Sequence, residues 1–290
     1  MSRPVTVGFD GSRESLAALD WAAGEAVSRA VPLRLLQVWS KDDGPRTRLV
    51  APGTAQGWGE RALGTAERRL RRRHPGLRTE TQWVCGGPVP ELCAAADEAE
   101  LLVLGSRGLG RSAGFLAGSV SLAVLARTRR PLALVRPHNR PAAGEEEPAG
   151  EVVVGLGVSA PGDEVLAFGF AAADRYGCGL RVLHAWAVPA VHGADMGGGL
   201  QLICARTAQD ARRALDEALA PWTEKYPEVS VVRDCHQGRP AQELVEASRG
   251  ARLVVVGRRN RRAGIGTHIG SVTHAAIHHS QAPVTVVPHG

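Results

Sequence analysis

Lysine is scarce in this chain of 290 residues, although 35 residues are basic. Lys41 and Lys225 are the only lysines, so arginine supplies nearly all of the positive charge. Neither lysine follows a glycine-rich loop, and the motif G-x-x-x-x-G-K-[ST] is absent. Enzymes that transfer phosphoryl groups usually place such a lysine on the phosphates. The sequence therefore does not support catalysis, and we expect a protein that is not an enzyme.

Cysteine, aromatic residues and long apolar runs are also scarce. The five cysteines contain no C-x-x-C pair, which argues against a disulfide framework and against a structural zinc site. Only 4% of the residues are aromatic, so few rings can stack on bases, and we expect no nucleic-acid partner despite a net charge of +6. No apolar run approaches the roughly 18 residues that span a membrane, and no signal-peptide pattern follows Met1. We therefore expect a cytoplasmic protein with no membrane partner.

Glycine, in contrast, is abundant, and the most informative glycines follow a predicted buried strand. That strand is the apolar run 101–104, and a helix is predicted at 120–127. Five glycines lie between them: Gly105, Gly108, Gly110, Gly114 and Gly118. Glycine lets the backbone take positive φ and approach a ligand closely, and the N–H groups that open a helix bind anions. The segment therefore has the chemistry of a phosphate-binding loop.

Strands and helices alternate along the first half of the chain. We expect strands at 4–9, 33–39, 79–85, 101–104 and 131–136, and helices at 13–30, 60–73, 88–99 and 120–127. Such alternation is typical of an α/β fold with a doubly wound parallel sheet.

The second half repeats the first. VGFDGS at 7–12 recurs as VGLGVS, and LRLLQVW at 33–39 recurs as LRVLHAW, both at an offset of 147. The later segments LLVLGSRG and Gly-Ser-Val recur at an offset of 152. Internal duplication of one α/β unit explains these matches. The sequence thus predicts two tandem domains, 1–137 and 151–290, joined by a linker at 138–150 that is rich in proline, glycine and glutamate.

The spacing Gly105-x-x-Gly108, nine residues, Gly118-Ser119, together with Asp10 at the end of the first strand, resembles the signature of the ATP-binding branch of the universal stress protein family. The whole chain resembles a tandem member of that family. The resemblance implies that the two units pair through their last strands as a pseudo-dimer, with a homodimer also possible. It further implies a stress-response regulator that binds ATP, with or without Mg²⁺, and whose nucleotide occupancy controls conformation or the binding of an unidentified protein partner.

In a doubly wound sheet, ligands bind at the carboxyl ends of the strands where the strand order reverses, and Asp10, Val38 and Gly105 lie at three such ends. The resemblance implies that Asp10 and Val38 border the adenine and ribose. It assigns the phosphates to Gly105, Gly108, Gly118, Ser119 and Val120, and Arg107 and Arg111 are available to neutralise phosphate charge. The alternative for Asp10 is a turn residue beside Gly11.

The second half retains only part of this set. The retained candidates are Gly257, Asn260, Gly270, Ser271 and Val272. Gly157 stands where Asp10 stands, so the ribose acceptor is missing, and Ala185 replaces Val38. Asn260 stands where Gly108 stands, and because asparagine tolerates left-handed backbone we expect the turn to survive. We predict weaker nucleotide binding here than in the first half.

Alternatives of other classes stay open. The chain could be a nucleotide-free interaction scaffold of the same fold or a slow ATP-hydrolysing enzyme, and a cyclic nucleotide could replace ATP as the ligand. His274 and His278 are spaced to share one face of a helix, but no cysteine or carboxylate completes a ligand set, so we predict no metal site.

Overall fold

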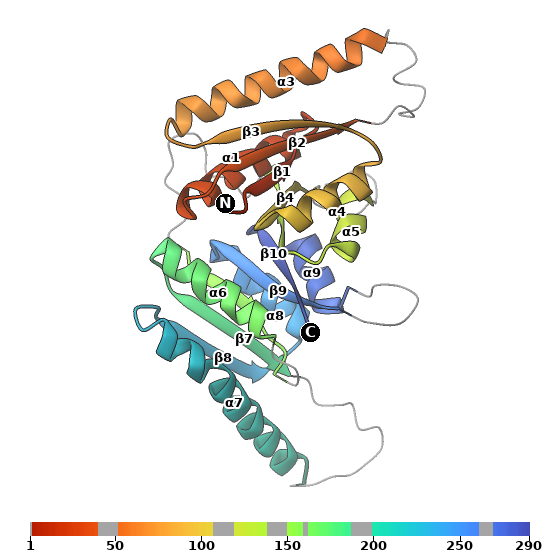
Figure 1. Cartoon of the computed structure of the whole chain (residues 1–290). Helices are drawn as coiled ribbons and strands as arrows, with labels where there is room; N and C mark the ends of the chain where they lie inside the picture. Colours follow the sequence, from red (N-terminus) through yellow and green to blue (C-terminus); the bar gives the residue numbers. More distant parts are fainter. Residues whose placement is uncertain are drawn as a thin grey trace. The chain divides into compact units, whose positions relative to one another are not determined.

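The computed structural model describes residues 2–39, 52–106, 119–137, 150–158, 162–186, 199–260 and 269–290, with the backbone alone described at 52–60 and 199–203. The chain forms two compact units, and the second begins at Glu146. Each unit contains a five-stranded parallel sheet with helices packed against it (Figure 1). Among the described residues, no helix combines the length and apolar character that crossing a membrane requires.

The first unit has the strand order β3-β2-β1-β4-β5. Its elements are β1 (Val5–Gly8), α1 (Arg13–Ser28), β2 (Leu33–Trp39), α3 (Pro52–Arg73), β3 (Thr79–Cys85), α4 (Pro88–Glu98), β4 (Leu101–Gly105), α5 (Ser119–Arg127) and β5 (Leu132–Val135). Helix α1 contacts α3, and α4 contacts α5. Strands β4 and β5 are buried on both faces, which requires helices on both sides of the sheet.

The second unit repeats this order as β8-β7-β6-β9-β10. Its elements are β6 (Val152–Gly155), α6 (Asp163–Tyr176), β7 (Leu180–Trp186), α7 (Gly199–Lys225), β8 (Val231–Gln237), α8 (Pro240–Ala247), a short 3₁₀ turn η2 (Ser248–Gly250), β9 (Leu253–Arg259), α9 (Ser271–His279) and β10 (Val284–His289). The predicted fold class, two tandem doubly wound α/β units, is therefore confirmed. The predicted pairing of the units through their last strands stays a prediction.

Helix α1 shows how local sequence signals set these boundaries. Ser12 caps its start, because the Ser12 Oγ accepts a hydrogen bond from the Ser15 N–H at 3.1 Å. At the other end Ala30 has φ 53°, and its N–H donates to the carbonyl of Val27. This left-handed residue satisfies a carbonyl at the helix end and turns the chain toward β2.

One predicted boundary is wrong. The sequence predicts a polar loop up to Gly59 and a helix from residue 60, whereas α3 begins at Pro52. Proline suits the first turn of a helix, where its missing N–H costs nothing, but three glycines at 53, 57 and 59 lower the helix propensity of this stretch.

Candidate functional site

The carboxyl edge of the first sheet brings three predicted site residues together. Strand β1 pairs in parallel with both β2 and β4, and Val7 lies opposite Leu35 on one side and Val103 on the other. The strand order therefore reverses at β1, which creates a crevice at the carboxyl ends. Asp10 follows the end of β1, Val38 is the penultimate residue of β2, and Gly105 ends β4.

Asp10 is exposed at this edge and combines the two roles considered for it. Its Oδ1 accepts a hydrogen bond from the Ser12 N–H at 2.9 Å, which is a turn interaction. Partial burial raises the pKa of Asp10, but hydrogen bonds from Ser12 and Ser15 outweigh this effect, so the pKa lies below its ordinary value. The Asp10 side chain is therefore a carboxylate that is ionised near neutral pH and fixed by a backbone hydrogen bond at the carboxyl edge of the sheet.

Gly105 is needed for close packing between the end of β4 and the start of α1. A Cβ at this position would lie 2.6 Å from the carbonyl carbon of Glu14 and 2.8 Å from the backbone nitrogen of Ser15. Because both atoms belong to the backbone, a side chain here would push α1 away from the sheet. Gly105 thus sets the width of the crevice floor.

Ser119 and Val120 open α5, and Ser119 is exposed. Sequence reasoning missed the role of Ser121 in the same turn: its Oγ donates a hydrogen bond to the Gly105 carbonyl at 3.2 Å. The second unit has the same contact between Thr273 and Gly257, at 2.9 Å. The sequence contained a signal for this role, because Ser121 and Thr273 are hydroxyl residues related by the repeat offset of 152. This bond ties the start of the helix to the end of the central strand.

The rest of the predicted phosphate loop, Arg107, Gly108, Arg111 and Gly118, lies outside the described residues. The roles of these four residues stay predictions.

The second unit places its retained candidates at the corresponding edge. Gly257 lies in β9, Gly270 caps α9, and Ser271 and Val272 form the first turn of that helix. Gly157, at the position of Asp10, is exposed, and a Cβ built on it would have no neighbour within 4 Å. The missing carboxylate therefore leaves open space.

The structure tests only part of the prediction for Asn260, because residues 261–268 of its turn lie outside the described residues. Among the described residues, Ala30 is the only non-glycine residue with positive φ, so Asn260 is not left-handed. Strand β9 continues to Arg259 beside His289, and the Asn260 N–H donates to the His289 carbonyl at 2.9 Å. In the first unit β4 already ends at Gly105. Asn260 thus continues the hydrogen bonding between β9 and β10 by one residue without a left-handed backbone.

His289 occupies part of the second crevice. A Cβ at Gly257 would lie 2.7 Å from its Nε2, and a Cβ at Gly162 would lie 2.8 Å from its Nδ1. At the counterpart of Gly257 in the first unit, Gly105, these neighbours are backbone atoms of α1. Helix α6 begins at Asp163, which aligns with the fourth residue of α1 at the offset of 147, and the imidazole lies beside Gly162 just before this helix.

The charges around His289 favour its neutral form. Burial lowers the pKa of His289, nearby Arg259 and Arg258 lower it further, and Glu164 opposes them. Arg258 is itself buried, and burial lowers its pKa. The second crevice thus contains a neutral ring beside two arginines and has no counterpart of Asp10.

The described residues hold no group of three or more His, Cys, Asp or Glu side chains that could bind a metal. The rings of His274 and His278 lie 4.2 Å apart between centroids, and His278 is buried.

Taken together, the fold and the two edges define a class of protein: a tandem of doubly wound α/β units, each with a crevice at its topological switch point, of which the first carries a carboxylate. A sequence model of the universal stress protein family matches residues 1–136 and 149–288. The chain therefore belongs to the universal stress protein family, as the glycine spacing and the internal repeat predicted.

Relatives of similar length support this assignment. Universal stress protein Rv2005c of Mycobacterium tuberculosis (strain ATCC 25618 / H37Rv) is 35% identical over 301 residues, which cover 99% of each chain. Universal stress protein Rv2623 of the same strain is 31% identical over 290 residues, covering 97% of this chain and 95% of the relative. The crystal structure of a universal stress protein from Archaeoglobus fulgidus DSM 4304 has a TM-score of 0.71 at 18% identity, covering 99% of this chain and 98% of that one. This structure has the same fold.

Proposed function

We propose that the first unit binds ATP, with or without Mg²⁺, at the carboxyl edge of its sheet, and that the bound nucleotide controls the conformation of the chain or its binding to a protein partner in a stress response. The observation that carries this proposal is the position of Asp10. Its exposed carboxylate lies at the switch point, beside the ends of β2 and β4.

Each part of the nucleotide has a candidate partner in this crevice. A carboxylate has about four acceptor positions, so the bond from the Ser12 N–H leaves Asp10 able to accept the ribose hydroxyls. The half-buried Val38 would border the adenine. The phosphates would lie toward Gly105 and the first N–H groups of α5, where the Ser119 hydroxyl can donate, because helix N-termini attract anions.

We propose a binding protein rather than an enzyme. The two lysines, Lys41 and Lys225, lie outside the glycine loop, so the usual lysine for a transferring phosphoryl group is missing. The second unit would act mainly as a structural partner, because Gly157 supplies no carboxylate and His289 fills part of the crevice.

Isothermal titration calorimetry with ATP tests the proposal. We expect binding to the wild type and roughly tenfold weaker binding to Asp10→Ala, because one charged hydrogen-bond acceptor is lost. Gly157→Ala is the matched control at the corresponding position of the second unit and should bind like the wild type. Absence of heat with the wild-type protein would overturn the proposal and favour a nucleotide-free scaffold.

Two further measurements separate the neighbouring functions. Titration with a cyclic adenine nucleotide in the same cell would identify the ligand class, and tighter binding than ATP would reject ATP as the ligand. Repeated Mg²⁺-dependent release of phosphate would contradict the non-enzymatic part of the proposal.

A further inference from the structure

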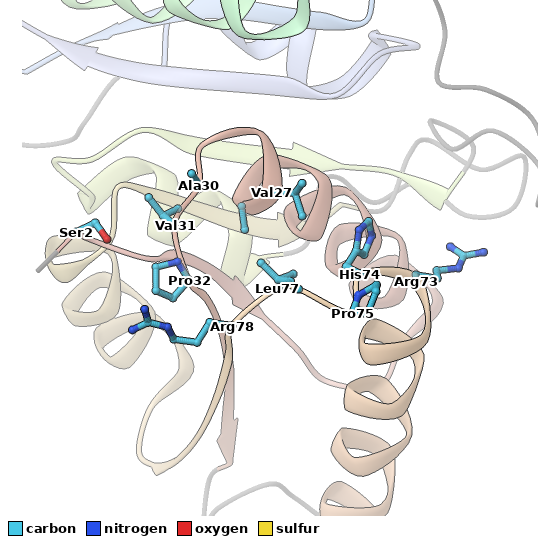
Figure 2. A pocket seen from close by; sticks show the side chains of 12 residues that line it. Ser2, Val27, Ala30, Val31, Pro32, Arg73, His74, Pro75, Leu77 and Arg78 are labelled. Atoms are coloured by element: carbon cyan, nitrogen blue, oxygen red, sulfur yellow. The ribbon is translucent and has the colours of Figure 1, made fainter.

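The first unit has an open cavity of about 670 Å³ at the amino edge of its sheet, opposite the crevice described above (Figure 2). The turn that links α1 to β2 forms one wall, and the turn that links α3 to β3 forms the other. Small-molecule sites commonly have volumes of about 300–1,000 Å³. The cavity is therefore large enough for a ligand, and it is separate from the proposed nucleotide site.

Apolar side chains form the middle of this cavity. Figure 2 shows Val31, Pro32 and Leu77 together between the two turns, with Val27 beside them on α1. Val27 is 50% exposed, whereas Ala22, Ala23 and Ala26 on the same helix are fully buried. Exposed apolar side chains that line a concave surface are typical of binding sites.

The charged side chains of the cavity are all basic. Arg73 and Arg78 lie at its two ends and His74 lies between them, and the part of the lining that the structure describes contains no aspartate or glutamate (Figure 2). Arg73 also lies 3.6 Å from Asp20, which holds it at the rim. An apolar floor with basic ends is complementary to a ligand that has an apolar body and a negative charge.

The second unit differs at the positions that correspond to this cavity. The lining residue His74 corresponds to Tyr226, whose ring stacks on that of Phe170 with centroids 5.7 Å apart. Phe170 itself corresponds to Ala23, a buried residue outside the lining. The second unit also carries Asp174 in place of Val27 and Ser230 in place of Arg78, whereas Lys225 keeps a basic side chain at the position of Arg73. The exposed valine and the arginine at one end are therefore features of the first unit that its duplicate lacks.

We propose that this cavity binds a small organic anion, a carboxylate or phosphate on an apolar body. The apolar body would lie on Val27, Val31 and Leu77, and the anionic group would lie at the arginine ends. This proposal goes beyond nucleotide binding and does not depend on it.

Methyl NMR with octanoate as the probe tests the proposal on the full chain. Octanoate should shift the methyl resonances of Val27, Val31 and Leu77 in a saturable titration, and octanol should bind roughly fivefold more weakly because it lacks the charge. Octanoate and octyl phosphate, compared in parallel, would identify which anionic group the site prefers.

Two variants of the first unit, each given the residue found at the corresponding position of the second unit, test the roles of the apolar floor and of the basic end. Val27→Asp places a carboxylate on the exposed floor, and Arg78→Ser removes one basic end; each should weaken octanoate binding roughly fivefold or more. Both positions are exposed, and unchanged circular dichroism and unchanged ATP titration would verify that each variant folds. No saturable shift with octanoate, equal binding of octanol, or unchanged affinity in Val27→Asp would each overturn the proposal.

Discussion

The residue that ends the first helix of each unit differs between the two units, although its backbone conformation is the same. Ala30 has φ 53°, and its counterpart at the helix end, Gly177, has φ 60°. In both units the N–H of this left-handed residue donates a hydrogen bond to the carbonyl three residues earlier in the chain. The N–H of the following residue donates to the carbonyl five residues before that following residue. A left-handed conformation is strained for alanine and free of strain for glycine.

We therefore expect Ala30→Gly to raise the free energy of unfolding by about 0.5–1 kcal/mol. Gly177→Ala should lower it by about 1 kcal/mol. Urea unfolding followed by circular dichroism measures both variants. A loss of stability in Ala30→Gly would show that the strain in the folded state is smaller than the entropy that glycine adds to the unfolded chain.

The corresponding glycines 105 and 257 have neighbours of different kinds. A Cβ at Gly105 meets backbone atoms of Glu14 and Ser15, whereas a Cβ at Gly257 meets the side chains of His289 and Val165. A side chain can rotate away, but a helix backbone must move as a whole. We expect Gly105→Ala to destabilise the chain by about 2–3 kcal/mol and Gly257→Ala by about 1 kcal/mol. Equal losses in the same urea experiment would contradict this explanation.

At the scale of elements, one hydroxyl in each unit joins the helix after the glycine loop to the central strand. Ser121→Ala and Thr273→Val each remove one such bond, so each should cost about 0.5–1.5 kcal/mol of stability. Ser121→Ala should also weaken ATP binding, because it releases the start of α5, where Ser119 lies. Thr273→Val is the matched control for the calorimetry and should leave the ATP affinity unchanged.

Strand β8 and helix α8 are joined by a histidine between two carboxylates. The His236 Nδ1 lies 2.8 Å from Asp234 and its Nε2 lies 3.3 Å from Glu243. Partial burial lowers the pKa of His236, but the hydrogen bonds and charges of Asp234 and Glu243 outweigh it, so the pKa lies above its ordinary value. Arg181, 3.3 Å from Asp234, competes for the same carboxylate.

This bridge makes part of the stability depend on pH. Because folding raises the pKa, the stabilisation is complete below the unfolded value of about 6.5 and is lost as the pH rises through the folded value. We expect the wild type to lose stability relative to His236→Gln as the pH rises above about 6.5 in urea titrations. His279→Gln, at an exposed position on α9, is the control. A constant difference across that range would contradict the assignment.

For the whole molecule, the asymmetry of the two crevices predicts one nucleotide per chain. Native mass spectrometry with ATP should show a single bound nucleotide in the wild type and a much smaller bound fraction in Asp10→Ala at the same ATP concentration. The double variant Gly157→Asp with His289→Ala restores a carboxylate in open space and removes the ring, so it should gain a second, weaker nucleotide. Two nucleotides on the wild type would show that the second crevice functions without a carboxylate.

Much of this architecture was predictable because the signals are local and occur twice. Apolar strands bounded by glycine, a serine cap and the offsets of 147 and 152 specify two doubly wound units and place Asp10, Val38 and Gly105 at one edge. The contribution of His289 was not predictable, because it depends on a helix that starts three residues later than its counterpart. The hydrogen bond from the Asn260 N–H to the His289 carbonyl depends on pairing between β9 and β10. Both are tertiary effects, and single-residue propensities do not contain them.

The change of offset from 147 to 152 has a physical location. Helix α3 has 22 residues and α7 has 27, and the difference of five accounts for the whole shift. At 1.5 Å per residue α7 is about 40 Å long, whereas the neighbouring seven-residue β8 spans about 23 Å, so the helix is roughly 17 Å longer than the strand. The five extra residues lie in the helix and disturb no strand pairing, which makes the start of α7 a suitable position for grafting a reporter peptide.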